Sequence, residues 1–274
     1  MLSNQDISHI YRHASIPEHL PDYVEAISRA EPHLIENHLC FIRSNHLLFI
    51  GYSLSGDNRD SHRAYTVACN EFRPATVAII APELWEMAEF YEEQPADSYY
   101  RLDLPLTAMP PDVDYMIRRA QKELIADSGK FGREHRKIIK AFISRHALSD
   151  RQKYIFKHIH QYLKRSRTTR LLEVRRKGRL AAFSIVDLGS ADSAFYLFNF
   201  RLPEVNVPGA SDLLFLEMVK LAQAEGKKTI NLGLGINSGI RRFKEKWGGA
   251  PFLPYVSALV HRRPVDLGRL AQKQ

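Results

Sequence analysis

Cysteine is scarce in this sequence, and long apolar runs are missing. Only Cys40 and Cys69 occur among the 274 residues, each in an apolar context and without CxxC spacing. This pattern argues against a disulfide framework and against a cysteine zinc site. No stretch approaches the roughly 18 apolar residues of a membrane span, and the N-terminus lacks a basic region followed by an apolar run. We therefore expect a cytoplasmic protein without a transmembrane segment.

Acidic residues are scarce in the second part of the chain. Residues 115–274 hold 32 Lys/Arg against 13 Asp/Glu, whereas residues 1–114 hold 7 against 18. Within the basic part, residues 151–179 contain eleven Lys/Arg and one acid. Such density indicates an anionic partner, namely nucleic acid, a phosphorylated cofactor or a membrane surface, or else a surface that docks on the acidic half. We expect an anionic ligand to lie against the basic half.

The remaining composition is that of a globular protein, with 45% hydrophobic and 26% charged residues.

In the first half, periodicity predicts a helix over 21–30, a hairpin over 39–55, a helix over 59–72, and strands over 75–84 and 99–106. Three helices are then predicted over 113–126, 133–146 and 150–164. The second half repeats the order, with a hairpin over 170–189, a strand over 193–201, a helix over 211–226, a strand over 227–235 and a last strand over 252–263. We predict an N-terminal domain over 1–112, a helical bridge over 113–165 and a C-terminal domain over 166–274.

The segment from Ile230 to Gly249, INLGLGINSGIRRFKEKWGG, combines a strand with a short basic helix. Apolar residues alternate with Asn231, Gly233 and Gly235, which is strand periodicity with no side chain at two positions. Such a strand lets a ligand lie against its backbone. Because valine suits the backbone of a strand, we expect Gly233→Val to obstruct that ligand without loss of stability.

The short helix that follows begins near Ser238, which is a favourable capping residue. Its apolar stripe is Ile240, Phe243 and Trp247, at steps of three and four. The rest of the helix carries four cations, Arg241, Arg242, Lys244 and Lys246. These cations either bind an anion or form a solvated basic face, and the pattern leaves both readings open.

A loop of small residues precedes the predicted helix over 211–226. Pro208, Gly209, Ala210 and Ser211 leave backbone N–H groups exposed at a helix N-terminus, where an anion such as a pyrophosphate is favoured. The alternative is a tight strand-to-helix connection with no ligand.

Taken together, the strand, small-residue loop, helix, glycine-bearing strand and NSGIRRFKEKWG segment resemble the second half of the GNAT N-acyltransferase fold. In that family, acyl-CoA lies between two splayed strands, and its pyrophosphate sits on a loop of pattern Q/R-x-x-G-x-G/A. Gly209 matches that pattern, whereas Asn206 replaces Gln/Arg and Ser211 replaces the last small residue. Asn237 matches the Asn that opens a later helix, and Lys244 stands where many members carry a Tyr general acid.

The phrase RFKEKWGG and the proline-containing loop resemble the double-GNAT branch more closely. That branch includes Fem-type peptidoglycan aminoacyltransferases and the C-terminal domain of lysylphosphatidylglycerol synthases. Its members pair two GNAT-like halves, take an aminoacyl group from tRNA, and have relatives that take acyl groups from CoA. The resemblance spans residues 35–262 in element order. It implies an α/β (α+β) fold of two mixed-sheet GNAT-like halves joined by a helical segment, the N-terminal half being degenerate and the C-terminal half binding the donor.

This resemblance implies the residues of a site. The donor is expected on Pro208, Gly209, Ala210, Ser211, Gly233, Asn237, Arg241 and Arg242. The catalytic candidates are Lys244, Asn231, Asn199 and Tyr196. Amine attack on a thioester or ester carbonyl generates an oxyanion and requires the amine to lose a proton, so polar groups on the two flanking strands suit this chemistry. For Asn199 and Tyr196, a solvent-facing strand position is the open alternative.

The expected function is therefore N-acyl transfer from acyl-CoA or aminoacyl-tRNA to an amine on a small molecule, peptide or lipid, without a metal. His158 and His160 are two residues apart on a predicted helix and face different sides, which argues against a metal pair. The alternative is a non-catalytic nucleic-acid or anion-binding protein with a degenerate GNAT fold, in which aromatic residues such as Tyr154, Phe156 and Tyr162 accompany the basic segment. Contact with tRNA and peripheral contact with a membrane stay open.

Overall fold

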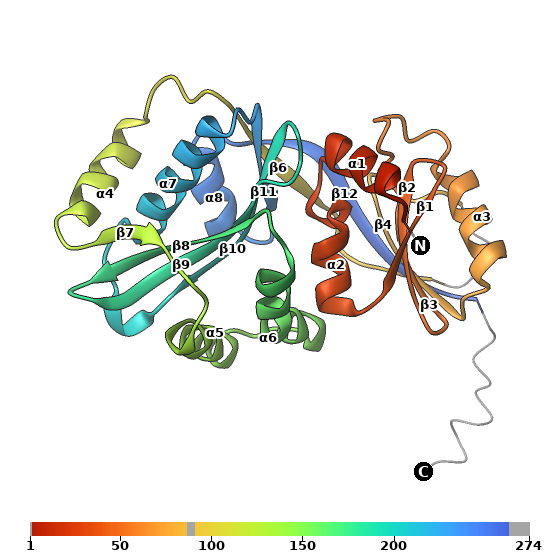
Figure 1. Cartoon of the computed structure of the whole chain (residues 1–274), viewed down its shortest axis with the longest axis horizontal. Coiled ribbons are helices and arrows are strands. Elements are labelled where there is room, and N and C mark those ends of the chain that lie inside the picture. The colour runs from red at the N-terminus through yellow and green to blue at the C-terminus, as the bar shows by residue number, and fades with distance from the viewer. Residues whose placement is uncertain (1, 87–90, 263–274) are drawn as a thin grey trace, which may run out of the picture. The chain divides into compact units, whose positions relative to one another are not determined.

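A computed structural model of the chain describes residues 2–86 and 91–262 and divides into two compact units (Figure 1). Of the described residues, the first unit takes 2–7, 29–86, 91–98 and 253–262, and the second takes 8–28 and 99–252. The chain therefore passes between the units several times. This division differs from the predicted one, because the helices predicted as a bridge lie within the second unit and the last strand returns to the first.

The first unit is an open mixed sheet with one covering helix. Its elements are β1 (Glu31–Ile35), β2 (His38–Arg43), β3 (His46–Ile50), α3 (Ser61–Phe72), β4 (Thr76–Ala81), β5 (Tyr91–Glu93) and most of β12 (Ala250–His261). The strand order is β1-β2-β3-β4-β12, with β5 also on β12, and among the described residues of this unit only the β3–β4 pair is parallel. The hairpin predicted over 39–55 is confirmed, since β2 and β3 pair antiparallel and turn between Arg43 and His46. Phe49 and Ile79 of the sheet and Tyr65 of α3 belong to one buried cluster.

The second unit holds the larger part of the chain. Its sheet has the order β6-β11-β10-β9-β8-β7, formed by β6 (Asp97–Asp103), β7 (Ile125–Ser128), β8 (Thr169–Arg176), β9 (Arg179–Asp187), β10 (Ser193–Arg201) and β11 (Thr229–Leu234). Its helices include α2 (Pro21–Ser28), α4 (Pro111–Gln121), α5 (Arg133–Arg145), α6 (Asp150–Arg165), α7 (Ala210–Ala224) and α8 (Ser238–Lys246). Short 3-10 turns cover Pro17–His19 and Pro203–Val205, and α1 (Asn4–His13) contains residues of both units. No helix within the described ranges is long and apolar enough to cross a membrane.

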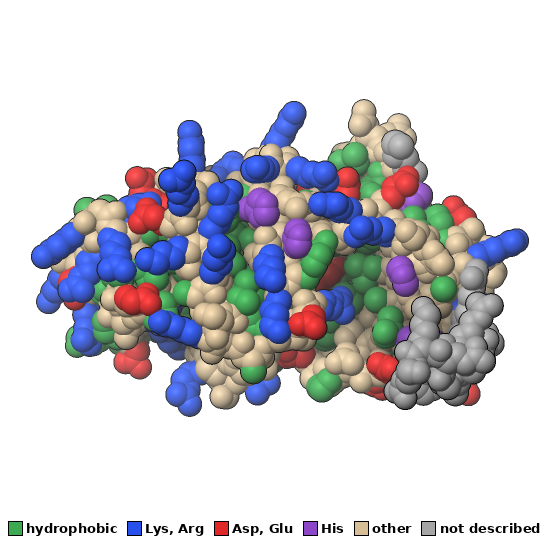
Figure 2. All heavy atoms as spheres, turned by 90° about the horizontal axis from the view of Figure 1, so that it is seen from below, with side chains coloured by type: hydrophobic (Ala, Val, Ile, Leu, Met, Phe, Trp, Pro, Cys, Tyr) green, Lys and Arg blue, Asp and Glu red, His purple; other side chains and the backbone are tan. Residues whose placement is uncertain are grey.

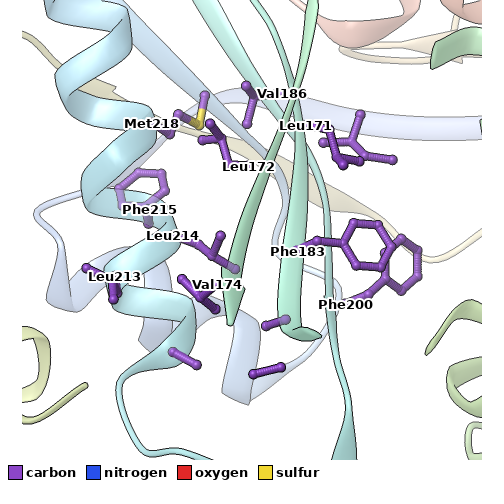
Figure 3. Close-up of a cluster of buried hydrophobic side chains, with 14 of the residues drawn as sticks. Leu171, Leu172, Val174, Phe183, Val186, Phe200, Leu213, Leu214, Phe215 and Met218 are labelled. Carbon is purple, nitrogen blue, oxygen red and sulfur yellow. The ribbon is translucent and has the colours of Figure 1, made fainter. Parts of the chain in front are cut away.

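Helices cover both faces of the second unit's sheet, with α7 on one face and α5 and α6 on the other (Figure 1). Figure 3 shows how strand periodicity produces the two layers, because Leu172 and Val174 point toward α7 whereas Leu171 points to the other side. Phe183 and Phe200 also lie on the side away from α7. The two-faced burial explains why β9 reads as a nearly continuous apolar run.

The layer between α5 and β8 contains a buried histidine. His135 is 2% exposed, and its Nδ1 accepts a hydrogen bond from the Gly132 N–H at 3.1 Å. The ring proton is therefore on Nε2, which lies 3.1 Å from the carboxylate of Glu173. Burial lowers the pKa of His135 despite the nearby Glu173 carboxylate.

We predict that His135 makes stability depend on pH below its ordinary pKa of about 6.5. In the unfolded chain the ring takes a proton as the pH falls through this value, whereas the folded ring resists protonation, so acid favours unfolding. The contribution of His135 to the free energy of unfolding should not change with pH above about pH 6.5. As the pH decreases below that value, the free energy of unfolding should decrease by at most about 1.4 kcal/mol per pH unit. Urea unfolding from pH 7.5 to 5.5 should show a shallower slope in His135→Gln. Equal slopes in the two proteins would contradict the prediction.

Candidate functional site

The parallel strands β10 and β11 pair only over their first residues. Register pairs run from Ser193↔Thr229 to Phe195↔Asn231, after which both strands continue without pairing to each other. Each strand has an irregularity at this point, between Tyr196 and Phe198 in β10 and between Asn231 and Gly233 in β11. Backbone of both strands is thereby released from the ladder at one place, where a ligand can lie against it.

The bulge in β10 gathers the polar residues predicted on that strand. Tyr196 and Asn199 are three residues apart, which would place them on opposite faces of a regular strand. The extra residue of the bulge brings both to the α7 face, where Asn199 Nδ2 donates to the Tyr196 hydroxyl at 2.6 Å and to Ser184 at 3.0 Å. Ser211 on α7 donates to Asn199 Oδ1 at 3.3 Å. The solvent-facing alternative for these two residues is therefore not observed.

The phenol of Tyr196 stays protonated throughout the neutral range. Burial raises the pKa of Tyr196 to about 12. The ring packs edge-on against Phe215 at a centroid distance of 5.1 Å. A phenol in this state can donate a hydrogen bond or a proton, but it cannot act as a base at neutral pH.

The bulge in β11 is fixed by Asn231, which is 1% exposed. Its Oδ1 accepts from the Gly233 N–H at 2.7 Å, and its Nδ2 donates to the Ser15 carbonyl at 2.8 Å. Both ends of this amide are thus occupied within the protein. Asn231 therefore holds the backbone shape of the β11 bulge.

Lys244 is buried rather than part of a solvated helix face. The side chain is 3% exposed, and Nζ donates to the carbonyl oxygens of Gly233 at 2.7 Å and Leu234 at 2.5 Å. Nζ also lies 5.2 Å from the ring centroid of Tyr100 on β6. The ammonium thus ties α8 to the end of β11 and places a positive charge beside Gly233.

The other cations of α8 divide into two groups. Arg241 and Arg242 are exposed in the first half of the helix. Lys246 instead contacts the buried carboxylate of Asp212 at 2.6 Å, and the Trp247 indole N–H donates to the same oxygen at 3.0 Å. Only the two arginines fit the interpretation of a solvated basic face.

The helix is capped by Asn237, whose Oδ1 accepts a hydrogen bond from the Ile240 N–H at 3.0 Å, and not by Ser238 as predicted.

Gly233 adopts a backbone conformation that contradicts the expected tolerance of valine. Its φ is +73°, a region that L residues rarely occupy, so any side chain here is strained. There is room for a Cβ atom at Gly233, because it would lie 3.8 Å from the Tyr196 carbonyl oxygen and 4.0 Å from Lys244 Nζ. The expectation that valine is tolerated at Gly233 fails because of the β11 bulge, which the strand pattern does not reveal.

We predict that Gly233→Ala lowers the free energy of unfolding by about 1–2 kcal/mol, from backbone strain alone. We also expect a donor lying between β10 and β11 to bind more weakly, because the new Cβ occupies the space beside the Tyr196 carbonyl. Urea unfolding and donor titration measure the two effects. Gly226→Ala is the matched control, since Gly226 has φ +69° with nothing within 4 Å of an added Cβ. The control should lose similar stability but no donor affinity, and an equal loss of affinity would contradict the prediction.

The loop before α7 is covered by another helix. Gly209 has φ +82°, and an added Cβ there would lie 2.2 Å from the Met116 carbonyl oxygen of α4. Three N–H groups of the loop donate within it, from Val205, Val207 and Ala210. The predicted residues are thus largely inaccessible, since Gly209 and Ala210 are buried and Pro208 and Ser211 are half-buried. The absence of a side chain at Gly209 allows the backbone of α4 to pack closely against the loop.

A strained turn joins β11 to α8. Ile236 has φ +53° and is 62% exposed, and the Asn237 N–H donates to the Gly235 carbonyl at 2.6 Å. This is the positive-φ form of the γ-turn, which is rare and strained, and β-branched residues seldom adopt it. Strain of this kind is concentrated at functional sites.

The structure therefore brings Tyr196, Gly233 and Lys244 together, with Asn199 and Asn231 supporting them. Ser184, Tyr100 and Asp212 also contribute, and no pattern in the sequence identifies the first two. Asp212 follows Ser211 in the first turn of a helix, a place typical of capping acids, but its contacts with α8 depend on tertiary structure. Within the described part of the chain, no three His, Cys, Asp or Glu residues gather as they would around a metal ion.

No protein-family model and no curated protein matches the sequence. Solved structures match it along nearly its whole length. FemX aligns with a TM-score of 0.64 at 11% identity, over 100% of this chain and 99% of that chain. The C-terminal DUF2156 domain of a putative lysylphosphatidylglycerol synthetase from Agrobacterium fabrum aligns at 0.60 and 12%, over 94% and 92%. A tandem GNAT protein from the clavulanic acid biosynthesis pathway aligns at 0.55 and 13%, over 96% and 97%.

These alignments establish the fold. The chain has a mixed α/β fold of the GNAT type, with two GNAT-like halves in one polypeptide. The particular form is the double-GNAT arrangement shared with FemX and the lysylphosphatidylglycerol synthetase domain, as the sequence resemblance predicted.

Proposed function

We propose that the second unit transfers an acyl or aminoacyl group from a bound donor to an amine, where β10 and β11 separate. The observation that carries this proposal is the interrupted parallel pair, with a bulge in each strand at the same level. A backbone N–H released from the ladder at the β10 bulge is a preorganised donor for the oxyanion that forms when an amine attacks a carbonyl, whereas the Gly233 N–H of the β11 bulge donates to Asn231 Oδ1. The GNAT-type fold supports this class of chemistry.

The side chains around the separated strands suit this reaction. Tyr196 keeps its proton and can give it to a departing group. Lys244 places a buried positive charge about 4 Å from the space beside Gly233, where negative charge would develop. Asn199 holds the Tyr196 hydroxyl, and Asn231 holds the β11 bulge.

For the donor, we propose aminoacyl-tRNA rather than acyl-CoA. A pyrophosphate needs open N–H groups at the start of α7, but the first of them, that of Ala210, donates to the Val207 carbonyl, and the loop packs against α4. Arg241 and Arg242 remain exposed beside the site and can contact a nucleic-acid backbone. The acceptor is an amine of a small molecule, peptide or lipid, and similarity to a lysylphosphatidylglycerol synthetase domain supports including lipids among the acceptors tested.

The test is a direct transfer assay on the purified chain. Radiolabelled aminoacyl-tRNAs and a panel of acyl-CoAs are each supplied with amine acceptors, and labelled product is separated from donor. We expect product from aminoacyl-tRNA, with a rate that falls as salt rises, because phosphate contacts are salt-dependent. The double variant Arg241→Ala, Arg242→Ala should bind tRNA more weakly. Lys220→Ala, an exposed residue of α7, is the control and should not.

Each other outcome has a defined meaning. Turnover with acyl-CoA and none with aminoacyl-tRNA would reverse the donor assignment but keep the transfer reaction. Binding of tRNA without turnover of any donor would favour the non-catalytic alternative. Absence of both binding and turnover would reject the proposed function.

A further inference from the structure

A cleft lies between α5 and α6, on the face of the second unit's sheet opposite α7. Its cavity volume is about 350 Å³, within the range of roughly 300–1,000 Å³ that is typical of small-molecule sites. Phe131, Ile139, Ile143 and Phe156 form an apolar floor. Three cations, Arg136, Lys140 and Lys157, stand among the lining residues. We call this feature the α5–α6 cleft.

The cleft exists because α5 has apolar residues on two of its sides. Ile138 is buried and Phe142 packs edge-on against Phe200 of β10 at 5.2 Å, so this side of the helix faces the sheet. Ile139 and Ile143, one turn apart, lie on a second side together with Lys140. Ile143 is only half-buried and lines the cleft.

The surface around the cleft is strongly basic. Residues 131–165 contain ten Lys/Arg and two Asp/Glu. Figure 2 views the side on which α5 and α6 lie in Figure 1, and Lys and Arg side chains crowd that face with hydrophobic surface between them. Arg145, Lys153 and Arg165 form ion pairs. Arg136, Lys140 and Lys157 are exposed and form no ion pair with any described residue.

We propose that the α5–α6 cleft docks the protein on an anionic phospholipid membrane, with a lipid chain against the apolar floor and the headgroup phosphate among Arg136, Lys140 and Lys157. Both properties of the cleft are needed for this ligand. A nucleic-acid backbone or a free phosphate would use the cations but would gain nothing from Ile139 and Ile143. Arg136 already lies 5.6 Å over the ring of Phe131, so its charge sits at the boundary between the two surfaces.

This inference does not depend on the proposed transfer reaction. The cleft belongs to α5 and α6, whereas the separated strands carry their polar side chains on the α7 face. Loss of membrane binding and loss of transfer can therefore be measured separately on the same chain.

The first test measures binding to vesicles by flotation. The full chain is mixed with vesicles of phosphatidylcholine alone or of phosphatidylcholine with phosphatidylglycerol. We expect binding only to the anionic vesicles, and at least about 25-fold weaker binding for Lys140→Glu, Lys157→Glu, since each cation near an anionic surface contributes about fivefold. The matched control is Lys122→Glu, Lys220→Glu, which changes the net charge equally but lies beyond α4 and on α7. An equal loss of vesicle binding in the control would show that the binding depends only on the net charge of the protein, and this would overturn the proposal.

The second test examines the apolar floor. Ile143→Ser should weaken vesicle binding severalfold at a salt concentration where surface charges are screened. Ile143→Trp should show a fluorescence shift to shorter wavelength with anionic vesicles, beyond that of the two native tryptophans. Melting temperatures near that of the unmodified chain show that each variant is folded. No effect of either change, or loss of tRNA binding with vesicle binding unchanged in the charge-reversal variant, would overturn the proposal.

Discussion

Replacing Gly209 with alanine is expected to destabilise the protein by about 3–5 kcal/mol, the range of severe core overpacking and strain combined. The residue has φ +82°, which costs an L residue roughly 1–2 kcal/mol. The added Cβ would also lie 2.2 Å from the Met116 carbonyl oxygen and 3.2 Å from the Ala120 Cβ. Both neighbours belong to α4, so relief requires the whole helix to move from α7. Urea unfolding monitored by circular dichroism measures the loss.

Gly178→Ala separates strain from the clash. Gly178 has φ +79°, almost the conformation of Gly209, but an added Cβ there meets nothing within 4 Å. We expect this control to lose only the strain, about 1–2 kcal/mol. If the two variants lost the same stability, close packing of α4 on the loop would not be supported, and α4 would not keep a pyrophosphate from this loop.

The loop around Gly209 shows what a sequence can and cannot specify about a glycine. The small residues correctly indicate that something approaches the backbone closely. They do not identify what approaches, because α4 lies about ninety residues earlier in the chain and its packing is a tertiary property. The resemblance to a phosphate-binding loop suggested an anion, whereas the group that lies against Gly209 is the α4 backbone at Met116.

Most strands and helices follow from local periodicity, and the exceptions have a tertiary cause. The hairpin about Gly178 and the helix over 150–165 agree with the pattern, the latter with a capping box at Ser149. The predicted helix over 113–126 instead ends at Gln121, and Ile125 and Ala126 pair with β8. A four-residue edge strand has too few residues to display alternation, so its neighbour decides its conformation.

The candidate site could be predicted only in part, because it depends on two bulges. A regular strand would separate Tyr196 from Asn199, and a bulge leaves no alternation that identifies it beforehand. The glycine at 233 marks the second bulge, but the same residue is equally consistent with open space along a flat strand. The helix pattern allowed Lys244 either to bind an anion or to lie on a solvated face, and the burial of Lys244 excludes the solvated face.

Replacing Lys244 with methionine is expected to lower both stability and transfer. The change keeps the aliphatic stem but leaves the carbonyl groups of Gly233 and Leu234 without the ammonium. Hydrogen bonds to charged groups contribute about 1.5–3 kcal/mol, so we expect a loss of about 2–3 kcal/mol in the free energy of unfolding. If the ammonium also stabilises the oxyanion, kcat per folded molecule should fall by a further factor of about 10²–10³, as for one preorganised electrostatic contact.

The two effects can be separated, which makes the role of Lys244 testable. Lys220→Met removes an exposed cation of α7 that pairs with Glu217, and should change stability by no more than about 0.5 kcal/mol. The transfer assay is run at a temperature where unfolding curves show Lys244→Met to be folded, and kcat and KM are determined separately. A fall in kcat with little change in KM would support an electrostatic role in the transition state, because the ammonium then acts on charge that is absent from the bound donor. Reduced stability with unchanged kcat would instead make Lys244 a structural tie between α8 and β11. The oxyanion would then depend on backbone N–H groups at the β10 bulge, because the Gly233 N–H of the β11 bulge donates to Asn231 Oδ1.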